Sequence, residues 1–364
     1  MTETMTALTV TTIALAPLAL LLAGLTPTGW ANRHPRAMFR IARGATFASF
    51  GAAAMASVLL AVRDGSPAVG TLLGQNGIGL TVYFDALSAT MALLVSFVGI
   101  IVIGYSKNYL DGDPGQGRFI KWLSLTLAAV LTLIISGNLL QFTLGWVATS
   151  LSLHQLLVFY GDRRAARLAA RKKFIASRLG DLSLLGAMVL LYNLFGSLDF
   201  TTMFAAADTL SETGEVPAGF HAVAVLLVVG AMMKSAQFPF HGWLTEVMET
   251  PTPVSALLHA GIINGGGFLI LRLSDIVSLS VPALQMLAVV GGFTALFASV
   301  VMLTQTSIKV SLAWSTIAQM GFMMLQCGLG AFSAAALHIV AHSLYKAHAF
   351  LSSGSVIDLS RGSW

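Results

Sequence analysis

Two lysines lie inside hydrophobic stretches of the sequence, where a charge is costly. Lys234 falls within the apolar run 223–240, and Lys346 falls within the run 331–357. A charged side chain at the centre of a membrane costs several kcal/mol and usually marks an ion pathway. The alternatives are that each ammonium group reaches the membrane surface along its own alkyl chain, or forms a structural pair with a buried acid. We take both lysines as candidate carriers of a proton or another cation.

Histidines fall in the same stretches. Six of the eight lie within the hydrophobic runs or at their ends: His154, His241, His259, His338, His342 and His348. His338, His342 and Lys346 are spaced four residues apart and would share one face of a helix. Since imidazole and desolvated ammonium groups can exchange protons near neutral pH, this stripe predicts a proton path. A lone buried histidine is more often a hydrogen-bonded packing element. No metal site is expected, because the helical zinc motif needs a carboxylate and a third ligand.

Proline and glycine interrupt the helical pattern beside these side chains. Pro239 follows Lys234 by five residues, Pro251 and Pro253 open the next hydrophobic run, and three glycines occupy 265–267. A proline removes a helical hydrogen bond and bends or breaks the helix. Broken helices beside buried ionisable groups are common in ion transporters, where freed backbone groups line a wet cavity. Both residue types are frequent in membrane helices generally, so it is their coincidence with buried bases that indicates a transport site.

The composition shows that membrane helices must position these residues. Of 364 residues, 56% are hydrophobic and 10% are charged. Soluble domains carry about 25% charged residues, so an ordinary soluble enzyme is excluded, and so is a disordered chain. At about 20 residues per span, we predict an all-α polytopic membrane protein with about eleven transmembrane helices. They are expected over 7–25, 44–62, 84–104, 120–137, 139–160, 180–197, 220–245, 251–272, 282–304, 308–327 and 331–357.

Basic residues in the connections predict the orientation. Arg63 and Arg272 fall on one side; the other side collects Arg33, Arg36, Arg40, Arg43, Lys107, Arg118, Lys121, Arg163, Arg164, Arg167, Arg171, Lys172, Lys173, Arg178, Lys309 and Arg361. The side with more basic residues is expected to face the cytoplasm, with the N-terminus outside and the C-terminus of this chain inside. We interpret 163–178 as a basic loop that sets orientation, with docking of a cytoplasmic partner as the second interpretation. Orientation accounts for the excess of bases, and no nucleic acid is expected as a partner.

Two stretches resemble a known family. Residues 234–241, Lys-Ser-Ala-Gln-Phe-Pro-Phe-His, and 251–260, Pro-Thr-Pro-Val-Ser-Ala-Leu-Leu-His-Ala, resemble the signature of the antiporter-like, proton-conducting subunits of respiratory complex I and of Mrp cation antiporters. The resemblance extends over about residues 80–358. It implies a bundle with two inverted five-helix repeats, each with a broken helix, and a line of buried protonatable side chains. Supporting stretches are 138–146, 178–181, 309–316 and 347–356.

The resemblance also implies roles and a domain layout. Lys234 would be the central lysine of the first half-channel and His259 a relay residue on the next helix. His338, His342 and Lys346 would form the link toward the second half. The expected organisation is N-terminal helices over 1–119, a first repeat over 120–272, and the start of a second repeat over 282–364. The second repeat is expected to be incomplete, because the family pattern continues beyond Trp364.

One position departs from the family pattern. The family places a glutamate directly after the Gly-Trp pair at 145–146, and this chain has Val147 there. His154 follows seven residues later, on the same helical face. A charge partner for Lys234 would then come from Asp181, Glu246 or another chain.

The loss of this acid, the sequence 151–160 and the basic run resemble the DabB branch of the family, the membrane subunits of two-component DAB inorganic carbon pumps in bacteria. That resemblance implies a proton or sodium gradient spent on hydrating carbon dioxide to bicarbonate. The cytoplasmic partner, DabA, resembles a β-type carbonic anhydrase and holds zinc, so neither a cofactor nor catalysis is expected in this chain. The expected location is the bacterial inner membrane. The alternatives are a proton-pumping complex I subunit, an Mrp-type cation/proton antiporter, and a scaffold that conducts nothing.

Overall fold

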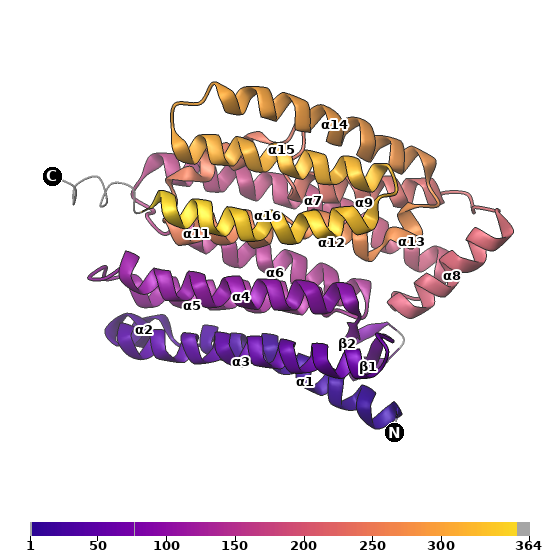
Figure 1. The fold of residues 1–364 in the computed structure, drawn as a ribbon, viewed down its shortest axis with the longest axis horizontal. Coiled ribbons are helices and arrows are strands. Elements are labelled where there is room, and N and C mark those ends of the chain that lie inside the picture. Colours follow the sequence, from indigo (N-terminus) through magenta and orange to yellow (C-terminus); the bar gives the residue numbers. More distant parts are fainter. Residues whose placement is uncertain (1, 76, 355–364) are drawn as a thin grey trace. The chain divides into compact units, whose positions relative to one another are not determined.

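The structure is a computed structural model that describes residues 2–75 and 77–354 (Figure 1). Each of the eleven predicted segments coincides with a helix or with helices separated by a break. Within the described part of the chain, eight helices are long and apolar enough to cross a membrane. The prediction of a helical, polytopic membrane protein is confirmed. Arg361 and residues 355–358 of the family resemblance lie outside the described residues.

The chain divides into two compact units. Unit 1 comprises the residues up to 156 together with 188–212, and unit 2 comprises 157–187 and the residues from 213 onward. The repeat boundaries expected from the family stay a prediction.

Unit 1 is a helical bundle with a small hairpin. Helix α1 packs against α3 and α5, and α3 also packs against α4. The Asp85 carboxylate begins α4 by accepting a hydrogen bond of 2.8 Å from the Ser88 N–H, which satisfies one unpaired donor of the first turn. Its elements are α1 (Thr2–Gly24), α2 (Thr28–Arg33), α3 (Pro35–Val62), β1 (Ala68–Gln75), β2 (Ile78–Phe84), α4 (Ala86–Tyr109), α5 (Gln116–Ile134), α6 (Leu139–Leu157) and α8 (Phe200–Thr213), the last two reaching one residue into unit 2.

The hairpin β1–β2 and helix α8 were not predicted. The strands pair antiparallel, with Ala68 opposite Phe84. The Asn138 side chain ties this hairpin to α6, since its amide donates to the carbonyl of Gly79 and the hydroxyl of Thr81, while its oxygen accepts from the N–H of Gln141. Because the predicted spans were chosen by hydrophobicity, these short amphipathic elements were assigned to connections.

Unit 2 contains most of helix α7 (Arg164–Phe195) and the remaining helices. Helices α14, α15 and α16 follow one another in orange and yellow in Figure 1. The elements are α9 (Phe220–Lys234), α10 (Gly242–Glu246), η1 (Val247–Glu249), α11 (Thr252–Leu257), the π-turn η2 (Leu258–Ile262), α12 (Gly265–Arg272), α13 (Ser274–Val277), α14 (Val281–Leu303), α15 (Ile308–Gly328) and α16 (Phe332–Ser353).

Helix α7 corrects one prediction. The basic run 163–178 was interpreted as a loop, but from Arg164 onward it forms the first turns of a 32-residue helix. Arginine, lysine and alanine are strong helix formers, and they continue a helix past the point where its apolar section ends. Hydrophobicity marks where a helix leaves the membrane, and it does not mark where the helix begins.

Candidate functional site

The chain is not helical immediately after Lys234. Helix α9 ends at Lys234 and α10 begins at Gly242, so the structure places Pro239 in the connection between them. Side chains hold this connection in place. The Ser235 hydroxyl donates to the carbonyl of Ile263 at 2.7 Å, and the Thr294 hydroxyl accepts from the N–H of Phe238 at 3.1 Å. The polar backbone groups released by the break are therefore partly satisfied by neighbouring segments.

Lys234 is buried, with 8% of its surface exposed. Gly265, at the start of α12, lies directly beside its alkyl chain, since a Cβ atom there would lie 3.6 Å from Lys234 Cε. At Gly266, a Cβ atom would collide with the Ala231 carbonyl and the Ser235 hydroxyl. Gly265 and Gly266 thus allow α12 to approach the end of α9 closely, where larger residues would separate the two helices.

Helix α7 contributes charged groups to the surroundings of Lys234. Asp181 forms an ion pair with Arg178, with 2.6 Å between Nη2 and Oδ2. Lys173 is more deeply buried, with 4% of its surface exposed. The charges of Lys173, Arg178 and Asp181 act on one another, and Lys234 interacts with the same group. We call Lys173, Arg178, Asp181 and Lys234 the α7–α9 cluster.

Sequence reasoning included Asp181 and missed Lys173. Lys173 was counted among the bases that set orientation, because the run around it looked like a loop. Once the run is read as a helix, Lys173 lies seven residues before Gly180 and on the same face of α7. Gly180 packs against α9, since a Cβ atom there would lie 3.1 Å from Met233 Cβ. That seven-residue spacing is the signal that could have revealed Lys173.

A second group of protonatable side chains lies on α16 and on the π-turn. His338 and His342 stack with 6.1 Å between ring centroids, and Lys346 follows one turn later on the same face. His259, in the π-turn η2, is completely buried and stacks on Phe350 with 4.2 Å between ring centroids. We call His259, His338, His342 and Lys346 the α16 cluster.

Hydrogen bonds join two members of the α16 cluster through α15. Lys346 Nζ donates to the carbonyl of Leu312 at 3.1 Å, and the Thr316 hydroxyl donates to the same carbonyl at 3.0 Å. His259 Nδ1 lies 2.9 Å from the Thr316 oxygen. A hydroxyl has one hydrogen to donate, so His259 Nδ1 carries the hydrogen and donates to Thr316. Nε2 of the neutral ring is then an acceptor, and it has no hydrogen-bond partner among the described residues.

Asn264 links the second broken region to α16. Its amide donates to the Ser343 hydroxyl at 2.8 Å and to the carbonyl of Ala260 at 3.1 Å. The structure places Pro251 before the first residue of α11 and Pro253 in its first turn, where their missing N–H groups cost nothing. His259 follows in the π-turn, a distortion that is frequent at functional sites.

The remaining predicted histidines lie elsewhere. His241 packs in an aromatic group, with ring centroids 5.2 Å from Trp314 and 5.6 Å from Phe238. His348 is exposed, and His154 is half-buried and belongs to unit 1.

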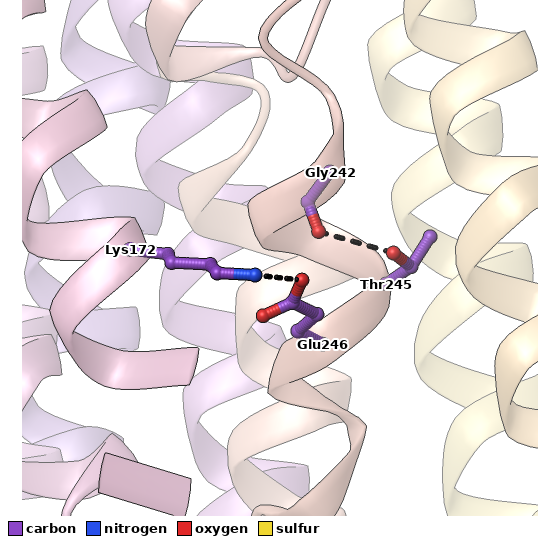
Figure 2. A network of polar contacts seen from close by, with 4 residues as sticks. All are labelled: Lys172, Gly242, Thr245 and Glu246. Atoms are coloured by element: carbon purple, nitrogen blue, oxygen red, sulfur yellow. Dashed lines mark hydrogen bonds and ion pairs between the residues drawn. The ribbon is translucent and has the colours of Figure 1, made fainter. Parts of the chain in front are cut away.

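Glu246, the other predicted charge partner for Lys234, binds a surface lysine. Figure 2 shows Lys172 of α7 reaching its carboxylate on α10, with 2.5 Å between Nζ and Oε1. In the same view, the Thr245 hydroxyl donates to the carbonyl of Gly242 at 3.0 Å. A groove of about 300 Å³ lies beside the ion pair. The pair fastens α7 to the helix that follows the break.

Metal ligation has no support in the described part of the chain, where no three His, Cys, Asp or Glu side chains gather.

A family model described as the transmembrane part of NADH:quinone oxidoreductase and Mrp antiporters matches residues 136–363. The chain belongs to this family. A second model, the N-terminus of complex I chain 5, matches residues 73–120. The resemblance inferred from the two signature stretches is confirmed.

Relatives in the family carry two kinds of name. The chain is 47% identical to a probable inorganic carbon transporter subunit, DabB2, of Halothiobacillus neapolitanus, over 94% of this chain and 62% of that protein. It is 40% identical to an NAD(P)H-quinone oxidoreductase chain 5 of Synechocystis, over 76% of this chain and 41% of that protein. The chain therefore spans about three fifths or less of the length of these relatives. The resemblance to the DabB branch is confirmed.

A solved structure shows the same fold. The Mrp complex of Dietzia matches 95% of this chain and 37% of the matched chain, with a TM-score of 0.84 and 26% sequence identity. The antiporter-like architecture of the membrane helices is confirmed.

Proposed function

We propose that this chain is the cation-conducting membrane subunit of a complex that accumulates inorganic carbon. Support comes from the family, from relatives named as probable inorganic carbon transporter subunits, and from two groups of protonatable side chains, most of them buried, beside broken helices. Lysine and histidine favour the proton as the conducted cation, and sodium is the alternative. The chain itself is a transport subunit, and catalysis belongs to a partner.

The observation that carries this proposal is the hydrogen-bonded connection from His259 through Thr316 to the carbonyl shared with Lys346. Each end of this connection can gain or lose a proton. Because Thr316 and Lys346 share one acceptor, a change in the charge of Lys346 alters the hydrogen bond of Thr316 and, through it, that of His259. As an acceptor, His259 Nε2 can bind an incoming proton.

The α7–α9 cluster is the proposed proton site of the first half-channel. Asp181 acts electrostatically on Lys234 and so supplies the negative charge that the family places at the position of Val147. His338 and His342 extend the stripe on α16. His154 and His241 stay predictions as pathway residues, since the first belongs to unit 1 and the second lies in an aromatic group.

The proposed partner is a cytoplasmic, zinc-containing, carbonic-anhydrase-like subunit of the DabA type. The proposed setting is a bacterial inner membrane, with the basic start of α7 on the cytoplasmic side and the N-terminus outside. In this arrangement the cation gradient dissipated through the membrane subunit drives hydration of carbon dioxide on the partner.

The test is bicarbonate accumulation in bacteria that lack carbonic anhydrase. Cells expressing the full-length protein together with its candidate partner are expected to take up labelled inorganic carbon and to grow in air. Either subunit alone, or an uncoupler, should abolish uptake. Uptake that persists with the uncoupler would contradict the proposal.

A proton-pumping subunit of a quinone oxidoreductase is the second candidate, favoured by the 40% identity to the chain 5 protein of Synechocystis. Purification of the full-length protein from its native membranes separates the two candidates. Co-purifying quinone-reducing activity would support the second, and a zinc-containing partner would support the first.

A further inference from the structure

The two residues that precede α12 contact elements of both clusters. On one side, the hydroxyl of Ser235, which follows Lys234, donates to the carbonyl of Ile263 at 2.7 Å. On the other side, the amide of Asn264 donates to the hydroxyl of Ser343 on α16 at 2.8 Å. This short segment therefore lies between the break at the end of α9 and the helix that carries most of the α16 cluster.

The orientation of the Asn264 amide is fixed by its neighbours. Its nitrogen lies 2.8 Å from the Ser343 hydroxyl oxygen and 3.1 Å from the carbonyl oxygen of Ala260. The Ser343 hydroxyl already donates its one hydrogen to the carbonyl of Ile339 at 2.7 Å, and a carbonyl can only accept. Both neighbours are thus acceptors, so the amide nitrogen faces them and uses its two hydrogens.

The oxygen of the same amide is a buried acceptor. Asn264 is completely buried, and its Oδ1 has no hydrogen-bond partner among the residues that the structure describes. Within the same residues, neither ring nitrogen of His342 has a partner, and 5% of the surface of that histidine is exposed. A buried polar atom left without a partner costs about 1–3 kcal/mol, and an ordered water commonly satisfies such atoms.

These atoms belong to two pairs of neighbouring residues that meet at Asn264. Ala260, which accepts from the amide, directly follows His259, and Ser343, the other acceptor, directly follows His342. The two histidines also interact electrostatically with each other. A buried water needs two to four polar partners, and the amide oxygen together with the two imidazoles can supply them.

We infer that Asn264 is a positioning residue of the proton pathway, whose side-chain oxygen holds a water through which protons pass between the Lys234 site and His342. This inference rests on the proposed function and names a further residue of the same pathway. The water takes up a proton on one side as it releases another on the other side, and Asn264 neither gains nor loses one. Gly265 contributes by bringing the start of α12 against the alkyl chain of Lys234.

The experiment measures proton flux in liposomes that contain the full-length protein with its partner and a pH-sensitive dye. A potassium gradient with valinomycin drives the flux. The wild type is compared with Asn264→Leu, with His342→Gln and with the double variant. The control is Asn193→Leu, which makes the same change at an exposed position of α7. Each flux is measured in H₂O and in D₂O, and thermal stability in detergent is measured for each protein.

We expect Asn264→Leu and His342→Gln each to lower the flux about tenfold, since leucine has the shape of asparagine without its acceptor and glutamine cannot titrate. Because both substitutions damage the same link, the double variant should conduct about as well as the weaker single variant. Independent effects would lower its flux about a hundredfold. The control should stay within about twofold of the wild type.

The isotope measurement separates a positioning role from a structural one. In Asn264→Leu, transfer through the damaged link becomes rate-limiting, so the ratio of flux in H₂O to flux in D₂O should rise above that of the wild type. A loss of folded protein would lower both fluxes equally and leave the ratio unchanged. Should Asn264→Leu fail to fold, Ser343→Ala replaces it. That variant removes one acceptor that orients the amide, and a several-fold loss of flux that does not add to His342→Gln is expected.

Flux in Asn264→Leu equal to that of the control would overturn the inference. So would losses that multiply in the double variant, or an isotope ratio equal to that of the wild type. These outcomes leave the proposed function intact. If the wild type passes no protons while carbon uptake persists, the proposed proton conduction fails instead.

Discussion

The α7–α9 cluster and the α16 cluster both bury a lysine beside a break in a helix, but they stabilise its charge differently. Around Lys234 the neighbours are charged groups, including the ion pair of Arg178 and Asp181. Around Lys346 the contacts are a carbonyl and, through it, a hydroxyl and an imidazole. The first lysine therefore lies among charged side chains, whereas the second is held by a hydrogen bond to a backbone carbonyl.

The two broken regions also differ in which residue lies at the interruption of the helix. The lysine of the α7–α9 cluster is the last residue of α9, so it lies at the break itself. In the α16 cluster, Lys346 lies within an uninterrupted helix, and the distortion is in the π-turn that carries His259. In the α7–α9 cluster the lysine lies on the interrupted segment, whereas in the α16 cluster the histidine lies on it. Substitutions in the two clusters should consequently have different signatures.

Replacing Lys346 with methionine should have the largest effect. The variant loses the donor to the Leu312 carbonyl and the group that carries the proton, so proton flux should fall at least about a hundredfold. Stability in detergent should be unchanged or higher, because a buried charge is replaced by an apolar chain of similar shape. Dye-based flux and thermal unfolding measure both effects. A loss of stability that parallels the loss of flux would indicate a structural role instead.

Asp181→Asn should test whether the α7–α9 cluster depends on its negative charge. The substitution removes the acid that pairs with Arg178. Proton flux should fall about tenfold, and the free energy of unfolding should fall by about 2 kcal/mol, the cost of losing a charged hydrogen bond. The control is Asp208→Asn, which neutralises an exposed acid on α8. If Asp181→Asn behaves like that control, charge does not govern the α7–α9 cluster.

Thr316→Val should test the hydrogen-bonded connection of the α16 cluster without changing any charge. The variant leaves His259 Nδ1 without its acceptor, which costs about 1–3 kcal/mol, and flux should fall several-fold to about tenfold. Thr316→Ser keeps the hydroxyl and should retain most of the flux. Equal flux in the valine and serine variants would remove Thr316 from the pathway.

Lys172→Gln should have the smallest effect. The ion pair with Glu246 lies at the surface, with 59% of the lysine side chain exposed, and pairs of this kind contribute about 0.2–1 kcal/mol. Flux should remain within about twofold of the wild type. A large loss of flux in this variant would mean that the tie between α7 and α10 is part of the conducting mechanism.

The sequence predicted what depends on local pattern. Hydrophobic runs located the helices, Pro239 marked the connection after Lys234, and the four-residue spacing placed His338, His342 and Lys346 on one helical face. These features need no knowledge of how helices pack. The two signature stretches identified the family because they contain its most specific residues.

Features that depend on packing could not be predicted in this way. Lys173 is buried although its basic neighbours suggest a solvated loop, and its helix packs at Gly180 against α9, which is distant in the sequence. The link from His259 to Lys346 passes through Thr316 and a backbone carbonyl, neither of which stands out in the sequence.

The most direct test of the account is proton flux through the full-length complex with Lys234→Ala, measured beside carbon uptake in cells that carry the same variant. Arg171→Gln serves as the control for loss of a positive charge. The account predicts that Lys234→Ala is present in the membrane at wild-type abundance and lacks both proton flux and uptake. Uptake at the wild-type level in Lys234→Ala would contradict it.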